Sequence, residues 1–236
     1  MAAPADARPL CLVVDDEPEL AAVVGDYLKR EGFGVQTIGD GEAAVDAARR
    51  ERPDVIVLDL MLPGIDGVEV CRQIRTFSDA YVLMLTARSE EVDKLIGLSV
   101  GAGDYMTKPF SPRELVARVK VLMRRPRGPV ADGGADVRVF GPLTIDLSAR
   151  LVGVDGQPVE LTRTEFDLLA TLSREPRLAF TRRQLVDAVW GPDWFGDDHI
   201  VDVHLAHVRR KLGDDASAPK FVRTVRGIGY GMGSGA

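Results

Sequence analysis

Four charged side chains and one hydroxyl stand at the ends of short apolar runs in the first half of this 236-residue chain. The run "VIVL" is followed at once by Asp59, and the run "CLVV" by Asp15 and Asp16. Two later runs lead to Thr86 and to Lys108. An unbroken apolar run is typical of a strand buried on both faces of a parallel sheet, so an acid at its end needs an explanation.

Carboxylates gathered in one place repel one another unless a cation lies among them. Oxygen-only ligands suit a small hard cation, so we expect Mg²⁺ at Asp15, Asp16 and Asp59, aided by the backbone carbonyl of Met61. A hydroxyl and an ammonium group, such as those of the fourth and fifth runs, supply the donor and positive charge that a phosphoryl group needs. These residues predict that Asp59 is a nucleophile that accepts a phosphoryl group in a near in-line transfer.

These side chains can meet only if their strands run parallel and end at one edge of a sheet. Five apolar runs alternate with helical patterns, at residues 11–14, 34–38, 54–59, 81–86 and 104–107. This alternation predicts a doubly wound parallel sheet, in which chemistry collects at the carboxyl ends of the strands. The fifth helix begins with "SPRE", where we expect Ser111 and Glu114 to form a capping box.

The pattern changes after Arg125, where "PRGPVADGGAD" is typical of a linker. Beyond it we expect a hairpin through Asp155-Gly156, and two helices that begin with the capping boxes "TRTE" (162–165) and "TRRQ" (181–184). A third helix is expected at about 198–212. Two strands around glycines, in "FVRTVRGIGYGM", follow it.

The composition excludes a disordered or a membrane protein, with 45% hydrophobic and 28% charged residues and no apolar run of roughly 18 residues. The N-terminus does not resemble a secretion signal, and two cysteines form no disulfide framework, so we expect a cytoplasmic protein with buried thiols. The net charge is −6, yet residues 199–236 hold six Lys and Arg against three Asp. A basic end is a hint of nucleic-acid binding.

The helix expected at 198–212 has an apolar stripe formed by Val201, Leu205, Val208 and Leu212. The opposite face should carry the remaining side chains, with two of them at its margins: His199, Val203, Ala206, His207 and Arg210, then Arg209 and Lys211. A helix that is packed on one side and basic on the other suits a reader of the major groove. We expect a thymine methyl contact from Val203, a base-edge contact from His207, and phosphate contacts from Arg209 and Arg210.

Several segments resemble a known family. "VVDDEPEL", "VLDLMLPGIDG", "LTAR" and "GAGDYMTKPFSPREL" resemble the receiver domain of two-component response regulators, over about residues 9–126. "LTRTEFDLL", "VDVHLAHVRRKL" and "VRTVRGIGYG" resemble the winged-helix effector domain of the OmpR/PhoB type, over 137–234, after a linker at 127–136. The resemblance implies a flavodoxin-like α/β domain with a five-stranded parallel sheet, followed by an α+β winged helix-turn-helix domain.

The resemblance implies that a sensor histidine kinase phosphorylates Asp59, and that Thr86 and Tyr105 form a switch pair beside Lys108. It also implies a homodimer of the phosphorylated form with cross-subunit ion pairs, Lys94 with Glu114 and Asp104 with Arg118. Gly103 stands where the family has an acid, which puts a further pair with Arg125 in doubt.

For the second half, the resemblance implies that Arg226 enters the minor groove from the wing and that Thr224 binds a phosphate. It implies promoter DNA and RNA polymerase as partners, and no enzymatic turnover of a separate substrate. The family often has Arg where His199, Ala206 and His207 stand, so we expect a shallower salt dependence of DNA binding than is usual.

Three alternatives remain. A haloacid-dehalogenase-type enzyme also uses an Asp nucleophile with Mg²⁺, but it needs a second acid where Met61 stands. A dinucleotide-dependent enzyme fits poorly, because "GAGDYM" lacks the final glycine and opens no helix after the first strand. The third alternative is a receiver that acts unphosphorylated through protein contacts.

Overall fold

A computed structural model describes residues 8–86, 98–123, 136–194 and 196–236. The chain divides into two compact units, Met1–Met123 and Arg124–Ala236. The expected linker, 127–136, lies outside the described residues except for Asp136. Among the helices in the described ranges, none is long and apolar enough to cross a membrane.

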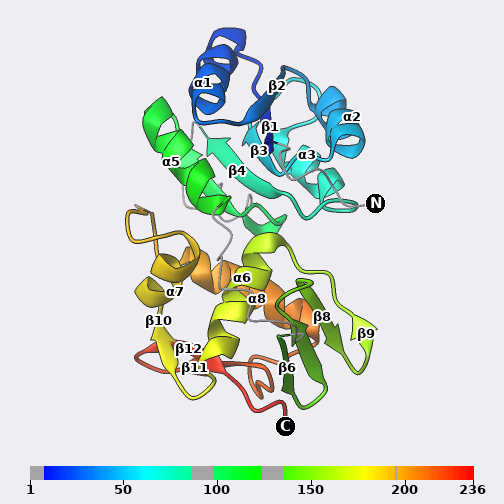
Figure 1. Cartoon of the computed structure of the whole chain (residues 1–236), viewed down its shortest axis with the longest axis vertical. Helices are drawn as coiled ribbons and strands as arrows, with labels where there is room; N and C mark the ends of the chain where they lie inside the picture. The colour runs from blue at the N-terminus through cyan, green and yellow to red at the C-terminus, as the bar shows by residue number, and fades with distance from the viewer. Residues whose placement is uncertain (1–7, 87–97, 124–135, 195) are drawn as a thin grey trace. The chain divides into compact units, whose positions relative to one another are not determined.

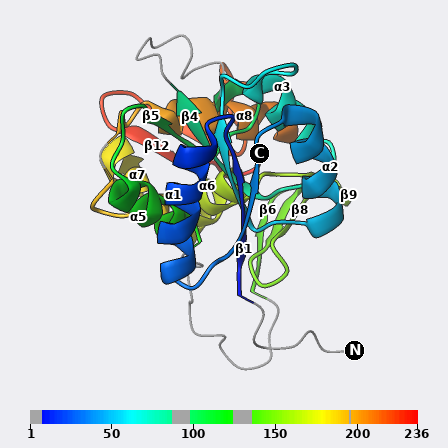
Figure 2. The same cartoon turned by 90° about the horizontal axis from the view of Figure 1, so that it is seen from above.

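The first unit is a parallel sheet with helices on both of its faces (Figures 1 and 2). Its elements are β1 (Leu10–Val14), α1 (Pro18–Arg30), β2 (Gly34–Ile38), α2 (Gly41–Glu51), β3 (Val55–Asp59), α3 (Gly67–Ile74), β4 (Tyr81–Thr86), β5 (Asp104–Thr107) and α5 (Pro112–Leu122). The strand order is β2-β1-β3-β4-β5. Figure 2 shows α1 and α5 on one face and α2 and α3 on the other. The doubly wound fold is confirmed, while the helix expected between β4 and β5 lies mostly at 87–97, outside the described residues.

The sheet order explains why β3 is apolar throughout. This strand pairs with β1 on one side and β4 on the other, and helices cover both of its faces. Val55, Ile56, Val57 and Leu58 are fully buried. Because β1 and β3 are adjacent and parallel, their carboxyl ends bring Asp15 and Asp59 to the same edge of the sheet.

The second unit combines two antiparallel sheets with helices (Figure 1). Its elements are β6 (Val137–Phe140), β7 (Leu143–Asp146), β8 (Leu151–Val154), β9 (Gln157–Pro158), α6 (Arg163–Arg174), β10 (Ala179–Thr181), α7 (Arg182–Val189), α8 (Ile200–Leu212), β11 (Val222–Val225) and β12 (Gly229–Met232). One sheet has the order β6-β7-β8-β9 and the other β10-β12-β11. This is the expected winged-helix arrangement, with the β11–β12 hairpin as the wing.

Local signals account for the boundaries of several elements in the second unit. The turn between β8 and β9 has positive φ at both Asp155 (51°) and Gly156 (75°), as the tight hairpin turn requires. Capping boxes form at Thr162 with Glu165 and at Thr181 with Gln184, as predicted.

The third predicted capping box is absent. Ser111 occupies the cap position of α5 but makes no side-chain cap hydrogen bond, and Pro112 opens the helix. Glu114 instead pairs with Arg118 one turn later, with Oε1 and Nη2 3.2 Å apart.

Candidate functional site

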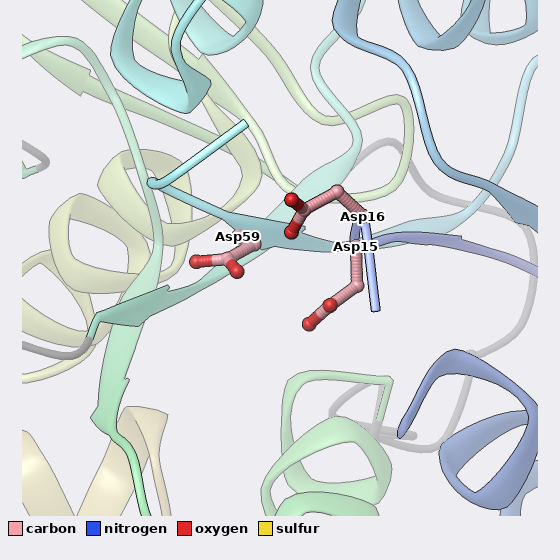
Figure 3. Close-up of side chains that lie close together, drawn as sticks. All are labelled: Asp15, Asp16 and Asp59. Carbon is pink, nitrogen blue, oxygen red and sulfur yellow. The ribbon is translucent and has the colours of Figure 1, made fainter. Parts of the chain in front are cut away.

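The carboxyl ends of β1 and β3 hold a cluster of three carboxylates. Asp15 and Asp59 are each 2% exposed, whereas Asp16 is exposed. One oxygen from each of the three groups lies within 4.8 Å of the others, and Figure 3 shows the side chains close together. These hard oxygen donors fit Mg²⁺, as expected from the sequence. Met61 directly follows this edge, and its backbone N–H donates to Asp59 Oδ1 at 3.1 Å.

Lys108 joins the two buried carboxylates from the loop after β5. Its Nζ lies 2.7 Å from Asp59 Oδ2, 3.0 Å from Asp15 Oδ2 and 3.3 Å from Glu17 Oε1. Burial alone would lower the pKa of Lys108, but its hydrogen bonds and attraction to Asp59 and Asp15 together raise that pKa above its ordinary value. The ammonium group therefore stays charged beside the predicted nucleophile.

The pKa of Asp15 is raised, mainly because burial disfavours the charged form, and the nearby Asp59 adds to this effect. Hydrogen bonds from the Glu17 backbone and from Lys108 oppose the increase without cancelling it. A cation bound at this cluster, in addition to Lys108, would favour the charged form of Asp15 and so lower its pKa.

Of the remaining predicted pocket residues, Thr86 lies at this edge, and Tyr105 lies two residues before the end of β5. Thr86 ends β4 and is buried, and its backbone carbonyl accepts a hydrogen bond from Lys108 N at 2.7 Å. Tyr105 lies in β5, half-buried, opposite Met84 of β4. The sequence pattern does not predict Gly67 as part of the site, yet a Cβ there would collide with the carbonyl oxygen of Asp59. The chain therefore needs glycine for α3 to begin this close to the nucleophile.

The residues expected at a dimer interface pair within one chain. Arg118 Nη1 lies 3.2 Å from Asp104 Oδ2, and Arg118 Nη2 lies 3.2 Å from Glu114 Oε1. Lys94 and Arg125 lie outside the described residues. Any cross-subunit pair of Asp104 with Arg118 would replace this internal pair.

In the second unit, α8 has the predicted apolar stripe. The side chains of Val201, Leu205, Val208 and Leu212 are buried. His199, Ala206 and Arg210 are exposed, and Val203 is half-buried. These four positions follow one another at helical spacing and form the solvent-facing side that a major groove could receive.

The prediction that His207 lies on this exposed face is wrong. Its side chain is buried, at 8% exposed, with Nδ1 3.7 Å from Glu165 Oε1 of α6. Lys211 reaches the same carboxylate, with Nζ 2.7 Å from Oε2. Burial lowers the pKa of His207, which outweighs the attraction of Glu165. Helix α8 therefore buries more than one stripe, because α6 contacts the side that carries these two residues.

Arg209 and Thr224, both expected at phosphates, contact each other. Arg209 donates from Nη2 to Thr224 Oγ1 at 2.8 Å, and from Nε and Nη2 to the carbonyl oxygen of Val222. Arg226 is exposed in the turn between β11 and β12, beside Gly227 with φ 77°. Of the arginines predicted to contact DNA, Arg210 and Arg226 are thus exposed to solvent.

Comparisons with known proteins match both halves of the chain. The family model described as response regulator receiver domain matches residues 11–120, and the one described as transcriptional regulatory protein, C terminal, matches 156–232. The chain is 45% identical to the DNA-binding response regulator MtrA of Mycolicibacterium smegmatis over 226 residues, which cover 96% of this chain and 97% of MtrA. It is 44% identical to the sensory transduction protein RegX3 of the same organism, over 93% of this chain and 96% of RegX3.

Solved structures also match nearly the whole chain. A mutant of the protein RitR matches with a TM-score of 0.76 and 28% identity, over 96% of this chain and 100% of that one. The response regulator DrrB, described as a Thermotoga maritima OmpR/PhoB homologue, matches with a TM-score of 0.52 and 31% identity over the same shares. The chain therefore belongs to the OmpR/PhoB family of two-component response regulators, in which a receiver domain precedes a DNA-binding winged-helix domain.

Proposed function

We propose that this response regulator is a transcription factor controlled by Mg²⁺-dependent phosphorylation of Asp59. The observation that carries the proposal is the convergence of Asp15, Asp16 and Asp59 beside Lys108 at one edge of the sheet. A sensor histidine kinase is the expected phosphodonor. The protein accepts the group on its own side chain and turns over no separate substrate, so we do not class it as an enzyme.

In the transfer, a carboxylate oxygen of Asp59 forms a bond to phosphorus. The bond between phosphorus and the donor's histidine nitrogen breaks, and the imidazole keeps the electron pair. Asp15, Asp16 and Asp59, with the carbonyl of Met61, would hold Mg²⁺, which neutralises charge on the transferring group when bound. Lys108 contacts Asp59 at 2.7 Å, so its flexible side chain can follow the new phosphoryl oxygens.

The new dianion then changes which packing the switch pair, Thr86 and Tyr105, adopts, and this change alters the surface formed by β5 and α5. We propose that the phosphorylated form dimerises through this side of the receiver domain, and that the internal pair of Asp104 with Arg118 is exchanged for a cross-subunit pair. The dimer binds promoter DNA in the cytoplasm and acts on RNA polymerase.

On DNA, α8 would lie in the major groove with His199, Val203 and Arg210 toward the duplex. Arg226 would enter the minor groove from the wing, and Thr224 would reach a phosphate. Arg209 donates hydrogen bonds to Val222 and Thr224 in the wing. To contact a phosphate, its guanidinium must therefore either divide its N–H groups between the wing and the phosphate or give up these hydrogen bonds. The exposed faces of α8 and the wing support this arrangement.

The test is intact-mass measurement after treatment with a small phosphodonor and Mg²⁺. The wild type should gain one acid-labile phosphoryl adduct, and Asp59→Asn should gain none. Asp66→Asn is a matched control, because this exposed residue caps α3 outside the cluster, and it should be phosphorylated normally. An adduct that persists in Asp59→Asn would refute the assignment. The phosphodonor should also raise the affinity for a selected DNA site in the wild type and in Asp66→Asn, but not in Asp59→Asn.

A further inference from the structure

One carboxylate, that of Asp202 in α8, connects three parts of the effector domain. Its Oδ1 accepts hydrogen bonds at 2.8 Å from Arg182 Nε, at the start of α7, and at 2.8 Å from the hydroxyl of Tyr230 in β12. Its Oδ2 lies 2.8 Å from Nδ1 of His199, the residue that precedes α8. Asp202 thus joins α7, the beginning of α8 and one strand of the wing.

A second connection lies two turns further along α8, on the other strand of the wing. Arg209 donates two hydrogen bonds to the carbonyl oxygen of Val222 in β11 and one to the hydroxyl of Thr224. Asp202 and Arg209 are about two helical turns apart, a rise of about 10 Å. Both strands of the wing are therefore tied to the same helix at two separate points, which fixes the position and the tilt of the hairpin.

The negative charge of Asp202 suits it to holding the wing against α8 and not to contacting DNA. A carboxylate that faced a phosphate backbone would be repelled by it. Here the charge is met by Arg182, and the ring of His199 adds a hydrogen bond. Burial alone would raise the pKa of Asp202, but the hydrogen bonds from His199, Arg182 and Tyr230 together lower it. Asp202 is thus a charged acceptor turned toward the domain's own donors.

The wing and α8 are expected to enter different grooves, so their relative placement must match one half-site. We propose that Asp202 is a positioning residue for DNA recognition, which holds the wing in register with α8 without itself contacting DNA. This inference rests on the proposed function. A wing held in place before binding loses less conformational freedom on binding, and its contact through Arg226 then contributes fully to affinity.

A double-mutant cycle tests the proposal, with DNA affinity measured by fluorescence anisotropy on a site selected from random duplexes. Arg226→Ala should weaken binding by the wild type about tenfold. In an Asp202→Ala background the same change should cost less than about threefold, because a misplaced wing no longer delivers Arg226 to the groove. Tyr230→Phe removes only the hydroxyl and should reduce the Arg226 effect in the same direction.

Asp198→Asn is the matched control, because it changes an acid just before α8 that makes no hydrogen bond to the wing in the described residues. The Arg226→Ala effect should stay about tenfold in that background. An undiminished Arg226 effect in both Asp202→Ala and Tyr230→Phe would overturn the positioning role. If Asp202→Ala fails to fold, as judged by tryptophan fluorescence, the Tyr230→Phe cycle decides alone. Failure of the wild type to select any DNA would instead overturn the proposed function, and the positioning role with it.

Discussion

Replacing Glu165 with Gln separates two roles of one buried side chain. Glu165 closes the capping box of α6, where Oε2 accepts from Thr162 N at 2.8 Å, and the same oxygen lies 2.7 Å from Lys211 Nζ. Glutamine can keep the first contact, since its side-chain oxygen is also an acceptor. The chain itself shows this in the second capping box, where Gln184 serves in place of Glu. The substitution therefore removes the ion pair and leaves the helix cap.

The expected size of the effect follows from the exposure of the two partners. Breaking a fully buried ion pair costs about 3–5 kcal/mol, and losing an exposed one about 0–1 kcal/mol. Glu165 is 1% exposed, but the side chain of Lys211 is 31% exposed and can return its ammonium group to water. We therefore expect Glu165→Gln to lower the free energy of unfolding by about 2 kcal/mol, between these limits.

The two tryptophans make this measurable in the intact protein. Trp190 and Trp194 are the chain's two Trp residues, and both are buried in the effector domain, so tryptophan fluorescence follows the unfolding of that domain. At a slope of about 2 kcal/mol per molar urea, the midpoint should fall by about 1 M. Glu160→Gln, an exposed change just before α6, should leave the midpoint where it is. A shift in Glu165→Gln no larger than that of this control would refute the reasoning.

The pH dependence provides a second check on the same substitution. Burial alone would raise the pKa of Glu165, but the charge and hydrogen bond of Lys211, with the N–H of Thr162, lower it below its ordinary value of 4.5. Because the pKa is lower in the folded state, the stabilisation is fully present well above pH 4.5 and is lost as the pH falls through the folded pKa. Gln does not titrate, so the difference in the free energy of unfolding between wild type and Glu165→Gln should shrink as the pH is lowered.

Three further substitutions test other parts of the molecule. Lys108→Ala should still be phosphorylated on Asp59 by a small donor but lose most of the donor-dependent gain in DNA affinity; a normal gain in anisotropy titrations would remove Lys108 from the switch. Gly67→Ala should lower the free energy of unfolding of the receiver domain by about 1–3 kcal/mol in circular-dichroism melts, because a Cβ collides with the carbonyl of Asp59; an unchanged melt would contradict this. Asp214→Ala should cost the effector domain about 2–4 kcal/mol by tryptophan fluorescence, because three backbone N–H groups lose their acceptor, whereas Asp215→Ala should cost less than about 1 kcal/mol.

The receiver fold can be predicted from the sequence because each strand carries its own signal. An apolar run indicates the strand, and the polar residue at its end indicates the carboxyl edge, so the sequence alone places Asp15, Asp59 and Lys108 together. The partners of these residues depend only on strand order, which the alternation of strands and helices restricts strongly.

The effector site is harder to predict, because it depends on which elements contact α8. A single helix shows one clear apolar stripe, and His207 falls well outside it, so the pattern assigns this residue to the exposed face. In the fold, α6 contacts α8 beside that stripe and brings the buried carboxylate of Glu165 to His207 and Lys211. No local pattern reports this contact. Strand β10 escapes prediction for a similar reason, because its three residues form a strand only by pairing with β12.

Buried and half-buried acids occur in both domains, and for Glu165, Asp202 and the receiver cluster the balance of charge distinguishes their roles. In the effector domain Glu165 has a cation, Lys211, at 2.7 Å, and Asp202 has Arg182 at 2.8 Å, so each carboxylate is matched by a positive partner. In the receiver domain, within the residues described, Lys108 is shared by three carboxylates, and Asp16 adds another negative charge next to them. One ammonium group cannot neutralise that set, and the raised pKa of Asp15 is consistent with the deficit. The matched acids hold elements together, whereas the unmatched set retains a negative charge that attracts a divalent cation.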